Sequence, residues 1–189
     1  MPPAIALAVE GGIDFLHLRA PQRGARETFE FGAALLPILR DRTHLVVNDR
    51  IDVAVALGAR FVQIPNHSLP VAVARRSFPN MGIGASVHSV EESVAAERDG
   101  ADWLMLGTIF STSSHPGRMG AGPQLIEQVR AVCQIPIVAI GGINLEGVEV
   151  VRVAGASGIA VISAVLSADD PRSAARSLRD AILDKVATR

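Results

Sequence analysis

The chain contains few of the residues on which several classes of protein depend. It has one cysteine, Cys133, no tyrosine, and a single lysine, Lys185. One thiol forms neither a disulfide framework nor a thiolate metal cluster, so a reducing, cytoplasmic location is expected. Chemistry that needs a lysine amine or a tyrosine phenol is nearly excluded.

Long apolar runs and an excess of one charge are also missing. Glycine, asparagine or charged residues interrupt the apolar runs well before the ~18 residues that a membrane helix requires. The first residues, MPPAIALAVEGG, have neither the basic flank nor the cleavage site of a signal peptide. The formal net charge of −1 gives no electrostatic footprint for nucleic acid. Secretion, a membrane function and nucleic-acid binding are therefore not expected.

The chain is long and hydrophobic enough for one globular domain over residues 1–189, with 49% hydrophobic residues. Short apolar, β-branched segments alternate with amphipathic stretches at even spacing, which predicts an α/β fold with a parallel sheet. The expected strands are Phe15–Leu18, Leu45–Val47, Phe61–Ile64, Met81–Ala85, Trp103–Gly107, Pro136–Ile140 and Gly158–Ile162. The expected helices are Ala4–Glu10, Val90–Asp99, Gln124–Val132, Glu146–Ala154 and Pro171–Val186.

The late glycines favour a (β/α)₈ TIM barrel over a dinucleotide-binding fold. No Gly-x-Gly-x-x-Gly follows any expected strand, so the dinucleotide fold lacks its fingerprint. The segments AIGGI (Ala139–Ile143) and IAVISA (Ile159–Ala164) are typical of the seventh and eighth strand ends of a barrel. Backbone N–H groups and a short helix N-terminus bind phosphate at that place.

The strand count is one short of a closed barrel. About seven strands are found where a barrel needs eight, and the chain opens on the helix Ala4–Glu10 with no strand before it. We therefore expect a barrel that lacks its first strand at the N-terminus, because of a late start codon or a trimmed chain. A barrel of seven strands, or one completed by another subunit, is the alternative.

Candidate site residues lie at the carboxyl ends of the expected strands, where the active sites of such barrels form. His17 and Arg19 share one side of a strand because side chains alternate along it. Arg19 offers a forked donor that suits phosphate or carboxylate, and a structural ion pair is the alternative. His17 lies deeper and is either a core residue of the barrel or a site residue. The further strand-end candidates are Asn48, Asp49, Ser86, His88, Thr108, Gly141, Gly142 and Ser163.

The segment after the expected strand Leu45–Val47 offers ligands for a ring or a metal ion. Asn48 and Asp49 there could hold a substrate ring and Mg²⁺, which prefers carboxylate oxygen. For Asp49, the cap of a helix that starts near Ile51 is the stronger interpretation.

A loop rich in hydroxyls and a pair of glycines are the best candidates for phosphate binding. The stretch Ile109–Gly122 carries four hydroxyls in Ser111–Ser114, and His115 and Arg118 add cationic donors. A long loop in a compact domain is more often functional than an exposed linker. The glycines of AIGGI let the backbone approach a ligand, and Ser163 adds a hydroxyl at the next strand end. Phosphate binding is therefore favoured over a simple tight turn.

Seven segments, in this order, resemble the thiamine-phosphate synthase/TenI family: FLHLR, NDRIDVAVALGA, VQIPNHSLP, IGASVHSVEES, GADWLMLGTIFST, IPIVAIGGI and AGASGIAVISA. The resemblance covers the chain from Ala4 onward and lacks only the family's first strand. It implies a (β/α)₈ barrel of thiamine biosynthesis that binds thiazole phosphate. The synthases of this family couple thiazole phosphate to a hydroxymethylpyrimidine diphosphate with Mg²⁺. The TenI-type members are thiazole tautomerases, which aromatise the thiazole by moving a proton.

The synthase pattern is only partly present. Its Gln-Leu-Arg-Glu-Lys segment keeps one residue, Arg19, and the diphosphate-binding lysine of the later loop falls on His115. The first Mg²⁺ carboxylate matches Asp49. The second belongs to a His-Leu-Gly-Gln-x-Asp segment that begins here at Gln63, and Ser68 stands in its place. These changes should weaken metal and diphosphate binding severely.

The TenI pattern fits better. Its HLR, VQLP and SVHS segments match His17–Arg19, Val62–Pro65 and Ser86–Ser89. The resemblance thus implies a TenI-like thiazole tautomerase. A divergent thiamine-phosphate synthase, and a non-catalytic protein that binds thiazole or thiamine phosphate, are the alternatives. No cofactor is expected for the tautomerase, whereas the synthase implies Mg²⁺.

The tautomerase reaction needs a general base, and Thr108 replaces the family's catalytic histidine. A hydroxyl without a partner is too weak a base at neutral pH. His115 is therefore expected to take the proton, with His17 as the second choice. The other three histidines are interpreted as surface or turn residues.

The family's thiazole-phosphate site is preserved best in this sequence, and we expect thiazole phosphate as the small-molecule partner. Arg19, Asn48, Ser86 and Gly141 are expected to bind substrate as well. A homo-oligomer is expected, as is common in the family. The positions carried over from the phosphate site are Thr112, Ser113, Ser114, Gly142, Ile162 and Ser163.

Overall fold

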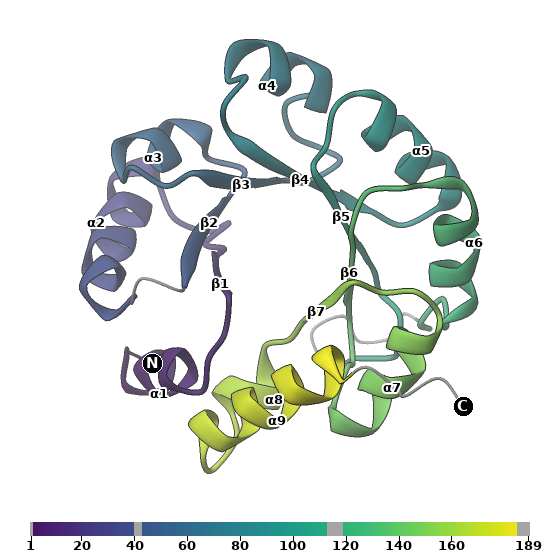
Figure 1. Cartoon of the computed structure of the whole chain (residues 1–189). Coiled ribbons are helices and arrows are strands. Elements are labelled where there is room, and N and C mark those ends of the chain that lie inside the picture. Colours follow the sequence, from purple (N-terminus) through teal and green to yellow (C-terminus); the bar gives the residue numbers. More distant parts are fainter. Residues whose placement is uncertain (1, 40–42, 113–118, 185–189) are drawn as a thin grey trace.

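The fold is one curled sheet of seven parallel strands, hydrogen-bonded in chain order, with helices on its outer face (Figure 1). The computed structural model describes residues 2–39, 43–112 and 119–184. The strands are β1 (Phe15–Leu18), β2 (His44–Asn48), β3 (Phe61–Ile64), β4 (Gly82–Val87), β5 (Trp103–Gly107), β6 (Ile137–Ile140) and β7 (Gly158–Ala160). The helices are α1 (Pro2–Glu10), α2 (Ala25–Leu35), α3 (Ile51–Ala56), α4 (Val71–Ser77), α5 (Val90–Arg98), α6 (Gln124–Val132), α7 (Leu145–Val153), α8 (Ser163–Leu166) and α9 (Pro171–Leu183), with a 3₁₀ turn η1 (Leu36–Ile38).

Side chains alternate between the two faces of the sheet, and this alternation decides the role of each strand residue. One set, which includes Leu18, Val47, Val62 and Leu104, is at most 3% exposed because the helices cover it. The other set faces the concave side of the curl and includes polar side chains such as Gln63. Burial of the first set drives folding, and the second set is left for a site.

The sheet curls without closing into a barrel. Strands β1 and β7 are the two edge strands of the sheet. Within the described part of the chain no further strand pairs with the open side of either one (Figure 1). The predicted TIM barrel is therefore confirmed only as a parallel, barrel-like sheet of seven strands, consistent with a barrel that lacks one strand. Helices α1 and α9 pack against each other on the side where the sheet is open (Figure 1).

An aromatic cluster lines the concave side at the amino ends of the strands. The ring centroids of Phe15 and Phe61 are 5.4 Å apart, and those of Phe61 and Trp103 are 6.1 Å apart. His44, interpreted from the sequence as a surface or turn residue, is exposed but lies 5.3 Å from the Phe61 ring. Phe15 is 52% exposed, since β1 has an open edge. The aromatic residues thus occupy the amino ends of the strands, and the polar residues of the concave side lie toward the carboxyl ends.

Three predicted strands, Phe15–Leu18, Phe61–Ile64 and Trp103–Gly107, have the predicted bounds. The last predicted strand is too long at its carboxyl end: it stops at Ala160, because Ile162 already occupies the N-cap position of α8. The short helix predicted for a phosphate site is thus observed there.

Helices α2 and α4 are missing from the sequence-based prediction, whereas α3 begins at Ile51, where a helix start was expected. Helix α4 spans only seven residues, too few for a clear amphipathic period, and α2 contains Gly32 in its interior, which is unfavourable in a helix. The start of α5 is better defined. The Ser89 side chain accepts a hydrogen bond from the Glu92 N–H at 3.2 Å, and the Glu92 carboxylate accepts one from the His88 N–H at 2.7 Å. Ser89 is therefore the N-cap of α5, and the Glu92 carboxylate binds the N–H of the residue before it.

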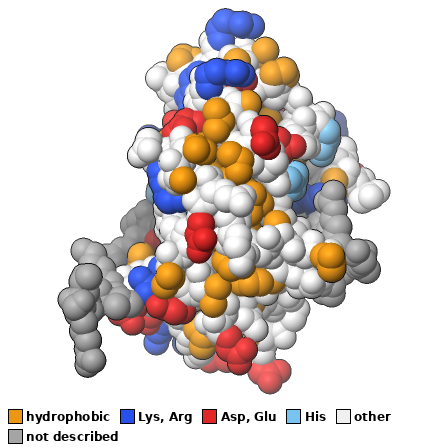
Figure 2. All heavy atoms as spheres, turned by 90° about the vertical axis from the view of Figure 1, so that its right-hand side faces the viewer, with side chains coloured by type: hydrophobic (Ala, Val, Ile, Leu, Met, Phe, Trp, Pro, Cys, Tyr) orange, Lys and Arg blue, Asp and Glu red, His pale blue; other side chains and the backbone are white. Residues whose placement is uncertain are grey.

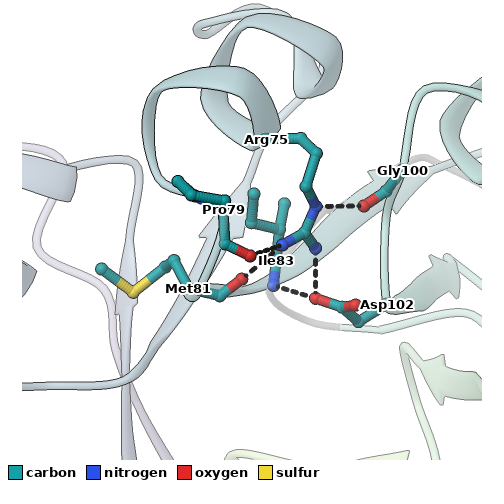
Figure 3. A network of polar contacts seen from close by, with 6 residues as sticks. All are labelled: Arg75, Pro79, Met81, Ile83, Gly100 and Asp102. Carbon is teal, nitrogen blue, oxygen red and sulfur yellow. Dashed lines mark hydrogen bonds and ion pairs between the residues drawn. The ribbon is translucent and has the colours of Figure 1, made fainter.

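Arg75 connects the last turn of α4 to the starts of β4 and β5 (Figure 3). Its guanidinium pairs with Asp102 at 2.5 Å, and the same carboxylate accepts the N–H of Ile83 at 2.7 Å. The backbone carbonyls that accept from this guanidinium are those of Gly100 at 3.0 Å, Pro79 at 3.0 Å and Met81 at 2.9 Å. One side chain therefore satisfies several loop carbonyls at the amino end of the sheet.

Arg130 repeats this arrangement two strand–helix units later, in α6. It lies in the last turn of α6, and its guanidinium donates to the carbonyls of Cys133 and, at 3.2 Å, of Ile135. Its aliphatic part covers Gly155, which has φ +106°, as Arg75 covers Gly100, which has φ +96°. The two arginines fasten helices to strands at the amino end of the sheet.

Arg75→Ala is expected to lower the free energy of unfolding by about 2 kcal/mol, because charged hydrogen bonds to partly buried carbonyls are lost. Arg98→Ala is the matched control, since the Arg98 side chain is 73% exposed and pairs only with its neighbour Asp99 among the described residues. Its change should stay within about 0.5 kcal/mol. Urea unfolding of both variants measures the difference, and equal losses would contradict the assigned role of Arg75.

The outer surface carries charges of both signs. On the face shown in Figure 2, basic, acidic and hydrophobic side chains of the described residues are interspersed. Among the helices that the structure describes, none is long and apolar enough to cross a membrane.

Candidate functional site

His17 faces the concave side of the sheet near the carboxyl end of β1. Its imidazole hydrogen-bonds to the Asn48 side chain at the end of β2, while Nε2 is buried with no partner among the described residues. Burial lowers the pKa of His17 from its ordinary 6.5 to about 4; the hydrogen bond to Asn48 opposes this shift and the charge of Arg19 adds to it. His17 is therefore a neutral imidazole with one unused buried atom.

This lowered pKa makes folding stability depend on pH. Between pH 6.5 and about 4 the unfolded chain binds a proton at His17 that the folded chain does not, so the free energy of unfolding falls as the pH drops through that window. His17→Gln should remove this component, whereas His67→Gln, on an exposed turn, should keep it. Urea unfolding at pH 7.5 and pH 5 tests this, and equal pH dependence in wild type and His17→Gln would contradict it.

Arg19 directly follows β1 and is exposed. In the part of the chain that the structure describes, no carboxylate pairs with its guanidinium, and its charge reaches His17. The alternative interpretation, in which Arg19 forms a structural ion pair, therefore finds no carboxylate partner among the described residues. The forked donor remains available to an anion at this end of the sheet.

Asp49 lies at the carboxyl end of the next strand with an unusual backbone. Its φ is +66°, and its N–H donates to the Gln63 carbonyl at 2.8 Å. The Ser68 hydroxyl donates to its carboxylate. The interpretation of Asp49 as a helix cap is wrong, because Arg50 holds the N-cap position of α3 and the Asp49 carboxylate turns to Ser68. Among the described residues no group of three or more metal-ligating side chains exists.

The loop after β5 and the two glycines after β6 are held together by backbone hydrogen bonds. The N–H of Ile109 donates to the Ile140 carbonyl and that of Phe110 to the Gly141 carbonyl, both at 2.9 Å. A Cβ on Gly142 would lie 2.4 Å from the Ser111 carbonyl oxygen. The absence of a side chain at Gly142 is therefore required by the neighbouring loop.

Thr108 and the end of β7 complete this edge of the site. A Cβ on Gly141 would meet the Thr108 methyl at 2.4 Å, so Thr108 packs on the glycine turn. Ser163 is the first residue of α8, and both Ser163 and Ile162 are exposed. Thr112, in the loop after β5, is half-buried. The predicted site residues Ser113, Ser114 and His115, together with Arg118, lie outside the described residues.

Sequence patterns missed a hydrogen-bonded group on the concave side. Gln63 is fully buried and bridges Ser86, a predicted site residue, and Trp103. A glutamine between two apolar neighbours on a strand is the signal that could have revealed it. His88 is also more than a turn residue, because its Nδ1 contacts the Gly107 carbonyl at the end of β5. Both features tie β4 to β5 beside the site.

The sequence and the overall fold are similar to those of known proteins. Residues 2–165 match the family described as thiamine monophosphate synthase. The chain belongs to this family. The thiamine-phosphate synthase of Chlorobium luteolum is 44% identical over 174 residues, covering 90% of this chain and 82% of the relative. That of Pyrococcus horikoshii is 40% identical over 177 residues, covering 93% and 86%. The structure of a thiamine phosphate pyrophosphorylase from Pyrococcus furiosus has a TM-score of 0.87 at 38% identity, covering 96% of this chain and 88% of that chain.

These relatives within the thiamine monophosphate synthase family contradict the predicted tautomerase. Proteins that are 40% and 44% identical over about nine-tenths of the chain carry the name thiamine-phosphate synthase. The prediction gave too much weight to Ser68 and His115 in place of a carboxylate and a lysine. Mg²⁺ is held in many proteins by one or two carboxylates together with substrate phosphates, so the loss of one carboxylate does not by itself exclude the synthase reaction. The general-base role of His115 and His17 belongs to the tautomerase reaction and falls with it.

Proposed function

We propose that this chain is a thiamine-phosphate synthase, which joins thiazole phosphate to hydroxymethylpyrimidine diphosphate and releases diphosphate. The observation that carries the proposal is 40–44% identity, over nine-tenths of the chain, to proteins named for this activity. In the reaction a carbon–oxygen bond to the diphosphate breaks and a carbon–nitrogen bond to the thiazole ring forms. Negative charge grows on the departing diphosphate, so the site must stabilise an anion.

Arg19 is the described residue best suited to this task. It is exposed, has no carboxylate partner among the described residues, and stands beside His17 and Asn48 at the carboxyl ends of β1 and β2. A guanidinium in that position forms charge-assisted hydrogen bonds to phosphate oxygens. His17 and Asn48 then offer neutral hydrogen-bonding atoms for a ring next to the diphosphate. Because His17 is neutral above about pH 4, it adds no second cation at working pH.

The thiazole phosphate is assigned to the opposite side of the concave face. There Thr112 and Ser163 offer hydroxyls around the Gly141–Gly142 turn. The backbone bonds between this turn and the 108–112 segment keep the two parts in register, so the phosphate meets a preformed edge.

The Asp49 carboxylate fits a Mg²⁺ ion that enters with the diphosphate. It lies at the strand end beside the Ser68 hydroxyl, so oxygen atoms from both side chains are at hand. One carboxylate plus substrate phosphates is a common way to hold Mg²⁺. When bound, the ion would neutralise charge on the diphosphate.

Formation of product tests the proposed function directly. The purified chain, mixed with thiazole phosphate, hydroxymethylpyrimidine diphosphate and Mg²⁺, should form thiamine phosphate and diphosphate in equal amounts. Liquid chromatography with mass detection measures both products. If both substrates bind in separate titrations and no thiamine phosphate forms, the synthase proposal is refuted.

Asp49→Asn should raise the Mg²⁺ concentration for half-maximal activity by about tenfold, since the carboxylate is lost. Ser68→Asp should lower that concentration, because a second carboxylate joins the first. Asp52→Asn is the matched control: Asp52 is an exposed carboxylate three residues away that pairs with Arg50. It should leave the Mg²⁺ dependence unchanged. Equal curves for Asp49→Asn and Asp52→Asn would remove Asp49 from the metal site.

A further inference from the structure

The fully buried amide of Gln63 links three neighbouring strands on the concave side. The Trp103 indole N–H on β5 donates to Gln63 Oε1 at 3.0 Å. Gln63 Nε2 on β3 donates to Ser86 Oγ on β4 at 3.0 Å. Gln63 and Gly84 are partners in the β3–β4 register, and Gly84 and Trp103 are partners in the β4–β5 register. The chain of contacts thus crosses β4 at Gly84.

Gly84 makes this crossing feasible. A Cβ at that position would lie 2.2 Å from the Trp103 ring and 2.3 Å from Gln63 Oε1. Any other residue would therefore separate the indole from the amide. The glycine sits in the middle of a strand, where it costs stability, so its presence indicates that the contact between Gln63 and Trp103 matters.

The network also fixes the direction of each hydrogen bond. An indole N–H only donates, so the oxygen of the Gln63 amide has to face Trp103 and its NH₂ has to face Ser86. Ser86 Oγ is thereby an acceptor toward Gln63, and its own hydrogen is free for another partner. No residue in the described part of the chain accepts that hydrogen.

We propose that Gln63 is a positioning residue that presents the Ser86 hydroxyl as a hydrogen-bond donor to an oxygen of a bound phosphate ester. The proposal rests on the proposed function in one respect: Ser86, expected from the sequence to bind substrate, has to line the site of that reaction. Gln63 itself is fully buried and acts only through Ser86. Trp103 selects the orientation of the amide, and therefore the polarity of the hydroxyl.

A double-mutant cycle tests this role. Ser86→Ala and Gln63→Met should each lower kcat/KM for thiamine phosphate formation by about tenfold, the effect of one lost hydrogen bond. The double variant should also lose about tenfold and not about a hundredfold, because Gln63 acts through the missing hydroxyl. Gln63→His should restore most of the activity, since an imidazole accepts at one nitrogen and donates at the other. A hundredfold loss in the double variant would overturn the proposal.

The single tryptophan gives a readout that does not depend on catalysis or on a Gln63 variant. Trp103 is the only tryptophan in the chain, so a ¹H–¹⁵N spectrum contains one indole resonance. Adding thiazole phosphate, hydroxymethylpyrimidine diphosphate or inorganic phosphate should shift this resonance in the wild type, because a bond to the Ser86 hydroxyl polarises the Gln63 amide. The shift should be absent in Ser86→Ala.

The two experiments separate the inference from the proposed function. An indole shift that requires Ser86, in a chain that forms no thiamine phosphate, would support the role of Gln63 and refute the synthase. Product formation with an indole resonance that no phosphate ester moves would support the synthase and overturn the role of Gln63. An indole shift of equal size in wild type and Ser86→Ala would also overturn it.

Discussion

Arg19→Ala is expected to form thiamine phosphate with a kcat/KM about 100-fold below that of the wild type. The change removes a charge-assisted donor from a developing anion, which costs about 3 kcal/mol in sites of this kind. Arg19 has no described carboxylate to compensate for its charge, so an anion gains the full benefit of the guanidinium. Steady-state kinetics with the hydroxymethylpyrimidine diphosphate varied would show the loss.

Arg23→Ala is the matched control for this prediction. Arg23 follows β1 on the same segment, but its guanidinium lies 5.3 Å from the centre of the Phe31 ring. Its removal should leave kcat/KM within about twofold of the wild type. Arg19→Lys should recover part of the activity, since it restores the charge without the forked geometry. If Arg19→Ala and Arg23→Ala behave alike, Arg19 does not bind the diphosphate.

Gly142→Ala is expected to have an effect of similar size on thiazole phosphate. The position has φ +64°, and the new Cβ would meet the Ser111 carbonyl oxygen at 2.4 Å and the Phe110 side chain at 2.9 Å. The loop after β5 has to move away from the glycine turn, which separates the two halves of the predicted phosphate site. We expect at least a ~100-fold loss of kcat/KM, as for the loss of preorganised donors.

Gly58→Ala separates the effect of backbone strain from that of the loop. Gly58 has φ +67°, nearly the same conformation, but nothing lies within 4 Å of a Cβ placed there. The variant should lose about 1 kcal/mol of stability to strain and keep its activity. Titration calorimetry with thiazole phosphate, together with urea unfolding, distinguishes the two variants. Normal affinity in Gly142→Ala would show that the phosphate lies elsewhere.

The sheet was predictable from the sequence because its strands are short apolar runs buried under helices. Phe61–Ile64 and Trp103–Gly107 have the predicted bounds for this reason. Closure was less predictable, since strand pairing across an open edge depends on residues far apart in the sequence. The short helix α4 escaped the prediction because fewer than two turns show no clear period.

The location of the candidate site was predictable from the sequence, but the contacts between its residues were less predictable. Strand ends predicted the positions of Arg19 and Asn48, because parallel strands bring their carboxyl ends together. The role of Asp49 was misjudged, since only the fold shows that Ser68, 19 residues later, meets its carboxylate. Gln63 was missed for the same reason: its partners come from two other strands. The choice of reaction failed because it gave single replacements more weight than similarity along the whole chain.

The positions of Arg75 and Arg130 separate the stabilising contacts at one end of the sheet from the candidate site at the other end. They fasten helices to strands at the amino end of the sheet, while Arg19, Asp49 and Ser86 lie at the carboxyl end. A substitution at the carboxyl end therefore does not disturb the bonds that hold the layers together. Ligand-binding residues at the carboxyl end can therefore be replaced with little effect on the contacts that Arg75 and Arg130 make. This separation makes the carboxyl end a suitable target for redesigning substrate preference by mutation and selection.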